Sequence, residues 1–198
     1  MARFKLNNLL FFSLNKKKIT EVEKIFNNKK IKIHNLISYN KIKEPNENGL
    51  SFAENAKIKS SFGLNKFNIP CFADDSGLCV EAIKNKPGIK SRRFLEKFKS
   101  NYHAFEYIIS NVIKAKNDKA FFKTAICLSI KKNYHIVFEG RIMGRISLKP
   151  KGVGGFGYDP IFIPEGYKKT FAEMKLKEKN KISHRKIALT KMESFLFN

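Results

Sequence analysis

The chain has 198 residues, of which 42% are hydrophobic and 13% aromatic, and this length and composition suit one globular domain that buries a substantial core. No apolar run is long enough to cross a membrane, and the apolar stretch Leu9–Phe12 is too short for a secretory signal. These properties exclude a membrane-embedded protein and lead us to expect a cytoplasmic protein with a single domain over residues 1–198.

The formal net charge of +23 raises the question of a polyanionic partner. The positive charge is spread along the whole chain, however, and Lys, Asn, Ile and Phe recur throughout while Trp is absent. Because the codons of those four residues are rich in A and T, this bias is typical of an AT-rich coding sequence. We therefore favour compositional drift as the cause, do not expect nucleic acid as a specific partner, and keep nucleic-acid binding as the minority interpretation.

The first third of the chain alternates between strand and helix patterns. An apolar strand is expected at Leu9–Ser13, a helix at Lys17–Phe26 with apolar residues at helical spacing, and a second strand at Ile31–Ser38. Ser51 and Glu54 form a capping box, which predicts a helix that begins at Ser51 and ends near residue 63 or 65.

The rest of the chain continues this alternation. Cys71–Ala73 reads as a strand that runs into two aspartates, after which Gly77 predicts a turn and Leu78–Ile83 a further strand segment. A helix is expected at Tyr102–Ala115, a pair of strands at residues 121–130 and 135–146, and a last helix from about Ser183. The pattern predicts an α/β fold with a mixed sheet.

The three cysteines, Cys71, Cys79 and Cys127, lie in apolar surroundings and include no C-x-x-C pair. Their odd number does not suit a disulfide framework. We expect buried, reduced thiols.

Two adjacent carboxylates, Asp74 and Asp75, follow an apolar strand in a chain with only 17 acidic residues. Ligands of α/β proteins gather where strands end, and Mg²⁺ takes one or two protein carboxylates. Glu47 could supply a second carboxylate, whereas its rival Glu54 is occupied by the capping box. The alternative is that the two aspartates only form a turn; the glycine-rich loop further along the chain makes us prefer a metal site.

The segments GGFGYDPIF at Gly154–Phe162 and EKNKISHR at Glu178–Arg185 are the most informative part of the chain. Glycines let a backbone approach a ligand closely, aromatic rings offer a face for a base, and Lys and Arg bind phosphates or carbonyl oxygens. His184 and Arg185 fall in the first turn of the predicted last helix, where a positive charge opposes the helix dipole. We therefore expect them to face a ligand, with a structural histidine as the alternative.

A second basic group precedes the first predicted helix. Ser13, Asn15 and Lys18 lie in the loop where a helix N-terminus could meet a phosphate, while Lys16 and Lys17 read as solvated lysines. After the later Pro-Gly turn, the arginines at 92 and 93 are either a further ligand-binding group or solvated surface.

Seven segments in chain order make the sequence resemble the inosine triphosphate pyrophosphatase family, the Ham1-like nucleoside triphosphate pyrophosphatases. They are SLNKKK, SFAENA, FADDSGL, PGIKSRRF, GGFGYDPIF, TFAEM and EKNKISHRKIAL, from Ser13 to Leu189. The resemblance implies an elongated mixed sheet flanked by helices, with two lobes and an active-site cleft between them, usually in a homodimer. It also implies Mg²⁺-dependent hydrolysis of ITP, dITP and XTP to the monophosphate and pyrophosphate, which cleanses the nucleotide pool of deaminated purines.

The resemblance also implies roles for particular residues. Glu47 and Asp75 would hold the metal, and Asp75 would accept a proton. The implied substrate contacts are Ser13, Leu14, Asn15, Lys16, Lys17, Lys18, Ser76, Phe156, Gly157, Tyr158, Asp159, Lys179, His184 and Arg185. The family's first loop usually reads T-G-N, so Ser13 keeps the hydroxyl while Leu14 replaces a glycine and removes backbone freedom.

Physical reasoning extends this picture. With an ordinary Asp pKa of about 3.9, Asp75 would be a weak base that chiefly holds metal and orients water. A donor such as Lys179 or Arg185 would pair with a 6-oxo group but face the donating 6-amino group of adenine unfavourably. Exclusion of guanine would depend on crowding at its 2-amino group. Two rivals stay open: a pyrophosphatase for other odd nucleotides such as modified pyrimidines, and a basic nucleic-acid-binding protein without catalysis.

Overall fold

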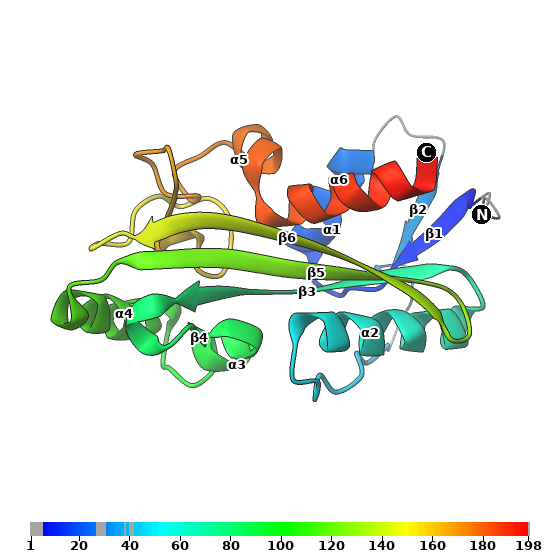
Figure 1. Ribbon diagram of the computed structural model, residues 1–198, viewed down its shortest axis with the longest axis horizontal. Helices are drawn as coiled ribbons and strands as arrows, with labels where there is room; N and C mark the ends of the chain where they lie inside the picture. The colour runs from blue at the N-terminus through cyan, green and yellow to red at the C-terminus, as the bar shows by residue number, and fades with distance from the viewer. Residues whose placement is uncertain (1–5, 27–30, 38, 40–41, 198) are drawn as a thin grey trace. The chain divides into compact units, whose positions relative to one another are not determined.

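A computed structural model describes residues 6–26, 31–37, 39 and 42–197, which form strands and helices in close alternation (Figure 1). In chain order they are β1 (Asn8–Phe11), α1 (Lys16–Phe26), β2 (Lys32–Asn35), α2 (Phe52–Phe67), β3 (Cys71–Val80), β4 (Lys86–Pro87), α3 (Ser91–Leu95), α4 (Asn101–Ala115), β5 (Lys119–Lys131), β6 (Tyr134–Ile146), β7 (Phe162–Pro164), α5 (Leu176–Ile182) and α6 (His184–Phe197). Short 3-10 turns lie at Glu81–Ile83, Gly88–Lys90 and Asp159–Ile161.

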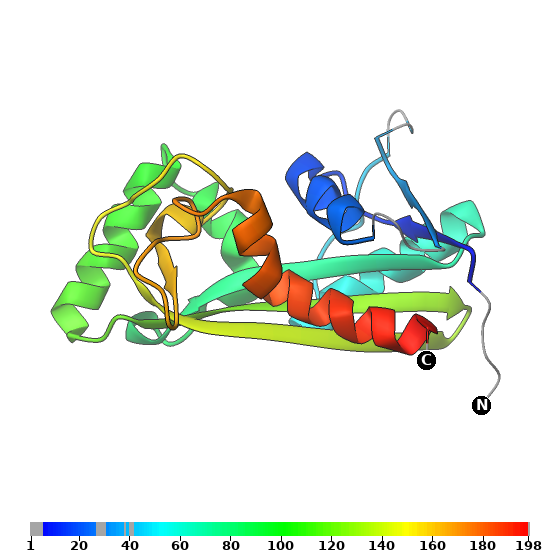
Figure 2. The same ribbon diagram turned by 90° about the horizontal axis from the view of Figure 1, so that it is seen from above.

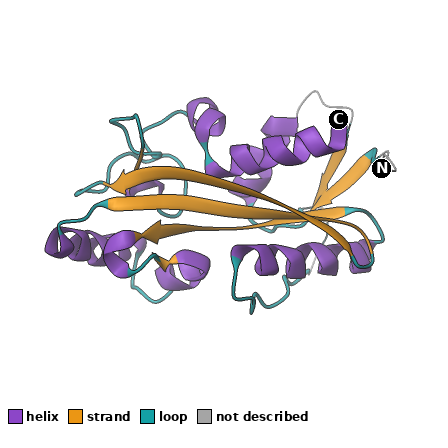
Figure 3. Cartoon of the chain, in the orientation of Figure 1, coloured by secondary structure: helices purple, strands orange, loops and turns teal. Residues whose placement is uncertain are grey.

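The strands form a mixed sheet in the order β2-β1-β3-β5-β6-β7, with β4 paired to β3. β1 runs parallel to both β2 and β3, whereas β3 with β4 and β6 with β7 are antiparallel. Helices and strands together make the predicted class, a mixed sheet flanked by helices, which is confirmed (Figure 3). Among the described residues, none of the helices has both the length and the apolar character that crossing a membrane requires.

The chain divides into two compact units. The first contains residues 1–75, 124–140 and 186–198, and the second contains residues 76–123 and 141–185. β3, β5 and β6 contribute residues to both units. The expectation of one domain over residues 1–198 stays a prediction.

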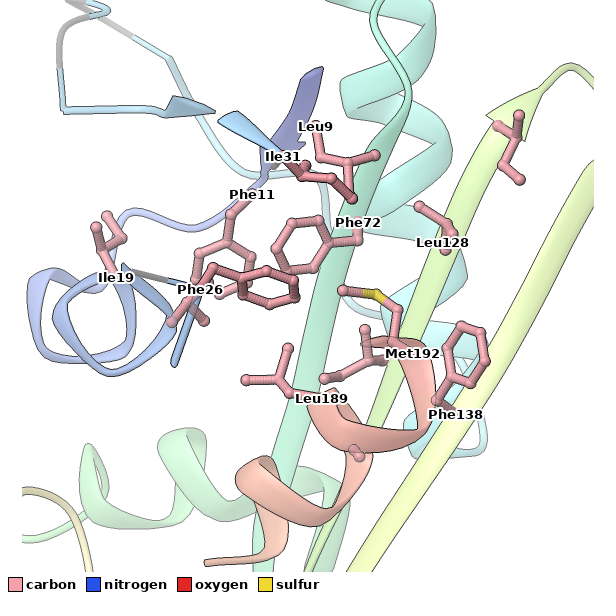
Figure 4. Close-up of a cluster of buried hydrophobic side chains, with 14 residues drawn as sticks. Leu9, Phe11, Ile19, Phe26, Ile31, Phe72, Leu128, Phe138, Leu189 and Met192 are labelled. Carbon is pink, nitrogen blue, oxygen red and sulfur yellow. The ribbon is translucent and has the colours of Figure 1, made fainter. Parts of the chain in front are cut away.

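The core of the first unit lies on both faces of β1, because side chains alternate along a strand. Leu9 and Phe11 pack with the apolar face of α1, with Phe72 of β3 and with α6; the ring centroids of Phe11 and Phe72 are 4.9 Å apart (Figure 4). α6 contributes Leu189 and Met192, and it runs along β5 and β6 in Figure 2. A central strand buried on both faces explains the continuous apolar run in the sequence.

The opposite face of β1 packs against α2. Leu10 and Phe12 form a second cluster there with Leu64, Cys71 and Ala73. The N-terminus of α2 is as predicted, since the Ser51 hydroxyl accepts a hydrogen bond from the Glu54 amide at 3.1 Å. The predicted end near residue 63 or 65 is wrong. α2 continues to Phe67 because Asn68 adopts the left-handed conformation and supplies the C-terminal cap.

The second unit has its own core between the sheet, α4 and the segment that includes β7. Its members are Leu78, Val80, Phe105, Ile108, Ile109, Val112, Ala120, Phe122, Ile146, Tyr158, Ile161, Phe162, Phe171 and Met174. The predicted helix at residues 102–115 and the paired strands are confirmed with shifts of one or two residues.

Other predictions need correction. The strand expected over Leu78–Ile83 ends at Val80, and Glu81–Ile83 forms a 3-10 turn. The predicted turn at Gly77 does not exist, because β3 runs unbroken from Cys71 to Val80, and a Cβ at Gly77 would collide with the Gly88 carbonyl and the Ser91 hydroxyl. The glycine therefore permits a close approach of two backbones. The second strand is shorter than expected, and Ser38 lies outside the described residues. The helix before α6 was not predicted: α5 ends at Ile182, and Ser183 separates the two helices in an extended conformation.

The buried cysteine prediction is confirmed, since Cys71, Cys79 and Cys127 are all unpaired thiols inside the protein. Burial raises the pKa of Cys79 to about 11, which keeps this thiol protonated.

We predict that Gly63→Ala destabilises the protein, although Ala is the better helix former. A Cβ at Gly63 would overlap Cys71 Sγ and lie 2.8 Å from a ring carbon of Phe12, both in the packed core beneath α2. Overpacking of this kind costs about 1 to 3 kcal/mol, measurable by urea unfolding. Asn65→Ala, at an exposed position of the same helix, is the control and should change the free energy of unfolding little. Equal stability of Gly63→Ala and wild type would contradict the packing argument.

Candidate active site

The loop between β1 and α1 is organised by Asn15, which caps the helix. Its side-chain oxygen accepts hydrogen bonds from the amides of Lys17 and Lys18 at 3.1 and 3.2 Å. The Ser13 hydroxyl accepts from the Asn15 amide at 3.2 Å. The loop thus owes its shape to side chains of the SLNKKK segment, so the capping role of Asn15 accounts for its position without a ligand.

The leucine that replaces the family's usual glycine is accommodated without strain. Leu14 is not among the described residues with a positive φ, so this position does not demand a glycine. The Leu14 side chain is partly exposed, and its amide donates to a carboxylate oxygen of Glu44 at 3.1 Å. Lys16 and Lys17 are exposed, as expected for solvated lysines.

Asp74 and Asp75 lie inside β3 rather than at its end, and both are buried. The Asp74 carboxylate is paired with Lys18, whose Nζ lies 3.0 Å from each oxygen. The Asp75 Oδ2 accepts a hydrogen bond from Asn55 Nδ2 at 3.0 Å. Neighbouring positions of a strand point to opposite sides, so the two carboxylates have different partners.

A buried lysine that sequence reasoning missed connects these groups. Lys59 Nζ lies 2.5 Å from a Glu47 carboxylate oxygen and 2.5 Å from the Asp74 carbonyl oxygen, and its side chain is 6% exposed. Asn55 and Lys59 are one turn apart on α2, and both face inward with the small residues Ala56 and Ser60. A lysine on the buried side of a predicted helix was the available signal.

We call Lys18, Glu47, Asn55, Lys59, Asp74 and Asp75 the carboxylate cluster; all six residues belong to the first unit. Glu54 is not part of it, because Glu54 accepts a hydrogen bond from the Leu50 amide at 2.8 Å beside the helix cap. The sequence argument that capping occupies Glu54 is therefore confirmed.

The cluster holds its charges against strong desolvation. Burial raises the pKa of Asp75 from 3.8 to about 6, although Lys59 and the hydrogen bond from Asn55 oppose that rise. Burial alone would lower the pKa of Lys59, but the nearby carboxylates of Asp74, Glu47 and Asp75 outweigh it and raise the pKa above its ordinary value. Lys59 is therefore a cation at neutral pH, whereas Asp75, with a pKa of about 6, ionises at a pH not far below neutrality.

The second unit brings together the glycine-rich loop and the basic residues that follow it. Asp159 Oδ2 accepts hydrogen bonds from the Phe156 amide and from Lys179 Nζ, both at 2.7 Å. Gly155 has a φ of +69°, and a Cβ there would collide with the Asp159 carboxylate. The loop therefore depends on glycine at this position, and Asp159 fixes both the loop and Lys179.

Positive groups lie close to the ring of Phe156. Lys179 Nζ is 4.5 Å and Arg185 Cζ 5.8 Å from its centroid. Arg185 is 1% exposed, and its Nη2 lies 3.3 Å from the Ser76 hydroxyl. We call Ser76, Phe156, Asp159, Lys179 and Arg185 the aromatic cluster; all five residues belong to the second unit.

Two predicted substrate contacts have evident packing roles. Tyr158 is buried in the core and donates from its hydroxyl to the Ser91 carbonyl at 2.8 Å. The ring of His184 stacks on that of Phe122, with centroids 4.7 Å apart and planes 8° apart. His184 does fall in the first turn of α6, as predicted. Contact of Tyr158 and His184 with a substrate stays a prediction.

The arginines after the Pro-Gly turn belong to the surface. The side chain of Arg92 is 76% exposed and is paired with Glu96 at 3.0 Å, one turn along the chain. This arrangement favours the solvated-surface alternative over a ligand-binding group. The neighbouring Ser91 is structural, because its hydroxyl binds the Leu78 amide and the Gly88 carbonyl.

Comparisons with known proteins agree over nearly the whole chain. The model described as "Ham1 family" matches residues 9–195. A dITP/XTP pyrophosphatase of Halalkalibacterium halodurans is 39% identical over 184 residues, which cover 92% of this chain and 95% of that protein. A HAM1 protein of Coxiella burnetii has a similar structure, with a TM-score of 0.86, 30% identity, and coverage of 96% of this chain and 98% of that one. The Staphylococcus aureus Ham1 protein gives a TM-score of 0.83 and 32% identity, and the match covers 96% and 97% of the two chains.

We predict that Asp75→Asn stabilises the metal-free protein at pH 8. The pKa of Asp75 is raised from 3.8 to about 6, so ionisation of Asp75 costs the folded state more than the unfolded state. The cost is absent below about pH 4, where both states are protonated, grows between pH 4 and 6, and is complete above pH 6. The asparagine should therefore raise the free energy of unfolding in EDTA by about 1 to 3 kcal/mol at pH 8.

Urea unfolding of both proteins at pH 4 and pH 8 checks this expectation, and the difference between them should vanish at pH 4. Glu106→Gln, on the exposed side of α4, removes a negative charge as well and should change stability little. If Asp75→Asn were less stable than wild type at pH 8, that result would contradict the raised pKa of Asp75.

Proposed function

The chain belongs to the Ham1 family, and from that premise we propose that it hydrolyses non-standard purine nucleoside triphosphates such as ITP, dITP and XTP to the monophosphate and pyrophosphate. The observation that carries the proposal is the carboxylate cluster, in which buried carboxylates, Lys18 and Lys59 gather at one place in the first unit. Such a mixture of oxygen ligands and ammonium groups suits a metal-bound triphosphate. The sequence-similar dITP/XTP pyrophosphatase supports the substrate class.

Glu47 and Asp75 would hold a magnesium ion. Both offer hard oxygen ligands, and Mg²⁺ commonly takes one or two carboxylates and completes its shell with water and phosphate. Within the part of the chain that the structure describes, no three His, Cys, Asp or Glu side chains gather as a metal-binding group. Bound there, Mg²⁺ would neutralise phosphate charge and acidify a water molecule.

The other residues of the cluster would act on the phosphates and the attacking water. Lys18, at the start of α1, would neutralise phosphate charge through its ammonium group. Asp75 would orient the water and accept its proton.

The aromatic cluster would recognise the base. The ring of Phe156 offers a face for stacking, and Lys179 and Arg185 offer donors for a 6-oxo group. Asp159 fixes Lys179 through an ion pair that is almost fully buried, so this donor cannot turn away from an adenine amino group at low cost. The same geometry would disfavour ATP.

The oligomeric state and the location of the protein are further proposals, made from the resemblance to the family. We propose a homodimer in the cytoplasm, for which sedimentation velocity on the purified chain is the direct measurement. Neither rival interpretation of the sequence gains support from the site. A nucleic-acid-binding protein would not need buried carboxylates, and the substrate panel below separates purines from modified pyrimidines.

We predict that the purified protein releases pyrophosphate from dITP, ITP and XTP far faster than from ATP, GTP or modified pyrimidine triphosphates, and that EDTA abolishes the reaction. Pyrophosphate release across this panel is the measurement. Asp75→Asn should fold normally and lose nearly all turnover, because it lacks the carboxylate proposed to hold the metal and accept the proton. Absence of pyrophosphate release from every purine would overturn the proposal, and tight, salt-sensitive binding to random DNA would then favour the nucleic-acid alternative.

We predict that Arg185→Ala narrows the discrimination between dITP and dATP. Loss of one donor to the base costs roughly 1 to 3 kcal/mol, so kcat/KM for dITP should fall by about 10- to 100-fold while that for dATP changes less. Arg93→Ala, at an exposed position, is the matched control and should keep the wild-type ratio. Thermal unfolding shows whether each variant is folded. An unchanged dITP to dATP ratio would exclude Arg185 from base recognition.

A further inference from the structure

Lys59 occupies a place in the carboxylate cluster that its neighbours make suitable for a cation. Its Nζ lies 2.5 Å from both the Glu47 carboxylate and the Asp74 carbonyl. The carboxylate of Asp75 is also near enough to act on the charge of Lys59. An ammonium group beside these oxygens takes the place that a divalent cation would take, and it is also positive, although it carries a single charge.

We infer that the Lys59 ammonium is an internal stand-in for the metal ion, so that Mg²⁺ must displace it from Glu47 in order to bind. The inference deepens the proposed function, on which it rests for the identity of Glu47 and Asp75 as metal ligands. Lys59 is thereby a positioning residue: it holds Glu47 to the cluster before the metal arrives.

Charge balance gives the reason for such an arrangement. A carboxylate buried without a counter-ion, as Asp75 would be, is strongly unfavourable, and the charge of the partly exposed Glu47 repels that of Asp75. Lys59 supplies that counter-ion in the metal-free protein. It is anchored on α2 by its chain position, so it cannot leave the site as a free ion would.

Displacement of the Lys59 ammonium from Glu47 would also free a hydrogen-bond donor for the phosphates of the substrate. An ammonium has three N–H donors, and the bond to the Asp74 carbonyl can persist when Glu47 turns to the metal. The donor released from Glu47 can then bind a phosphate oxygen. Metal binding would thus convert Lys59 from a counter-ion of the protein into a ligand of the substrate, which favours entry of the metal before or together with the triphosphate.

The test is metal affinity in the absence of nucleotide, measured with Mn²⁺ by electron paramagnetic resonance and with Mg²⁺ by calorimetry. Lys59→Met removes the competing cation and should bind either metal roughly tenfold more tightly or better than wild type, because opposite charges at this distance interact strongly in a partly buried site. Lys59→Arg keeps the charge and should bind as weakly as wild type. Lys191→Met, which removes an exposed lysine elsewhere, is the matched control.

Thermal unfolding gives a second readout. Lys59→Met should unfold at a lower temperature than wild type in EDTA, and saturating Mg²⁺ should raise its midpoint more than that of wild type, since tighter binding stabilises more. Should Lys59→Met fail to fold, the wild-type protein still decides the matter. The ¹⁵Nζ resonance of Lys59 should shift on titration with Mg²⁺, because the ammonium loses its bond to Glu47.

Two results would overturn the inference. One is metal binding by Lys59→Met that is equal to or weaker than that of wild type, which would mean that the ammonium helps to build the metal site instead of competing for it. The other is a Lys59 resonance that saturating Mg²⁺ leaves unchanged. Neither result touches the proposed function as long as wild type releases pyrophosphate from dITP, whereas absence of that release would overturn the function itself.

Discussion

A lysine ammonium buried beside three carboxyl groups is the interaction on which the first unit of this protein depends. The Lys59 ammonium is almost fully buried, and the nearby carboxylates of Asp74, Glu47 and Asp75 offset the cost of burying its charge. The pair also ties the loop that carries Glu47 to α2 and, through the Asp74 carbonyl, to β3. One side chain therefore links three segments of the first unit.

Each cluster contains a buried aspartate, and the surroundings of Asp75 and Asp159 differ. In the carboxylate cluster, burial raises the pKa of Asp75 towards neutrality. In the aromatic cluster, the buried Asp159 accepts hydrogen bonds from Lys179 and from the Phe156 amide, which hold it in place.

The glycines show how close packing supports both clusters. Gly77 lets β3 pass next to the Gly88 carbonyl, and so allows one uninterrupted strand to carry both aspartates. Gly155 lets the loop close onto the Asp159 carboxylate in a left-handed conformation. Many of the lysines that dominate the composition lie outside both clusters, and Lys16 and Lys17, for example, are exposed.

The sequence by itself determined the class of fold and most of the elements, since apolar periodicity and the Ser51 capping box are local signals. Its motifs also singled out Asp75 and Glu47 as candidate metal ligands and Lys18 as a candidate phosphate contact. Only the tertiary structure decided that β3 runs through Gly77 and that Lys59 joins the carboxylates. It alone showed that Tyr158 is bonded to Ser91. These outcomes depend on contacts between residues far apart in the chain, and the burial that gives Lys59 its partners and Asp75 its raised pKa has no counterpart in any short stretch of sequence.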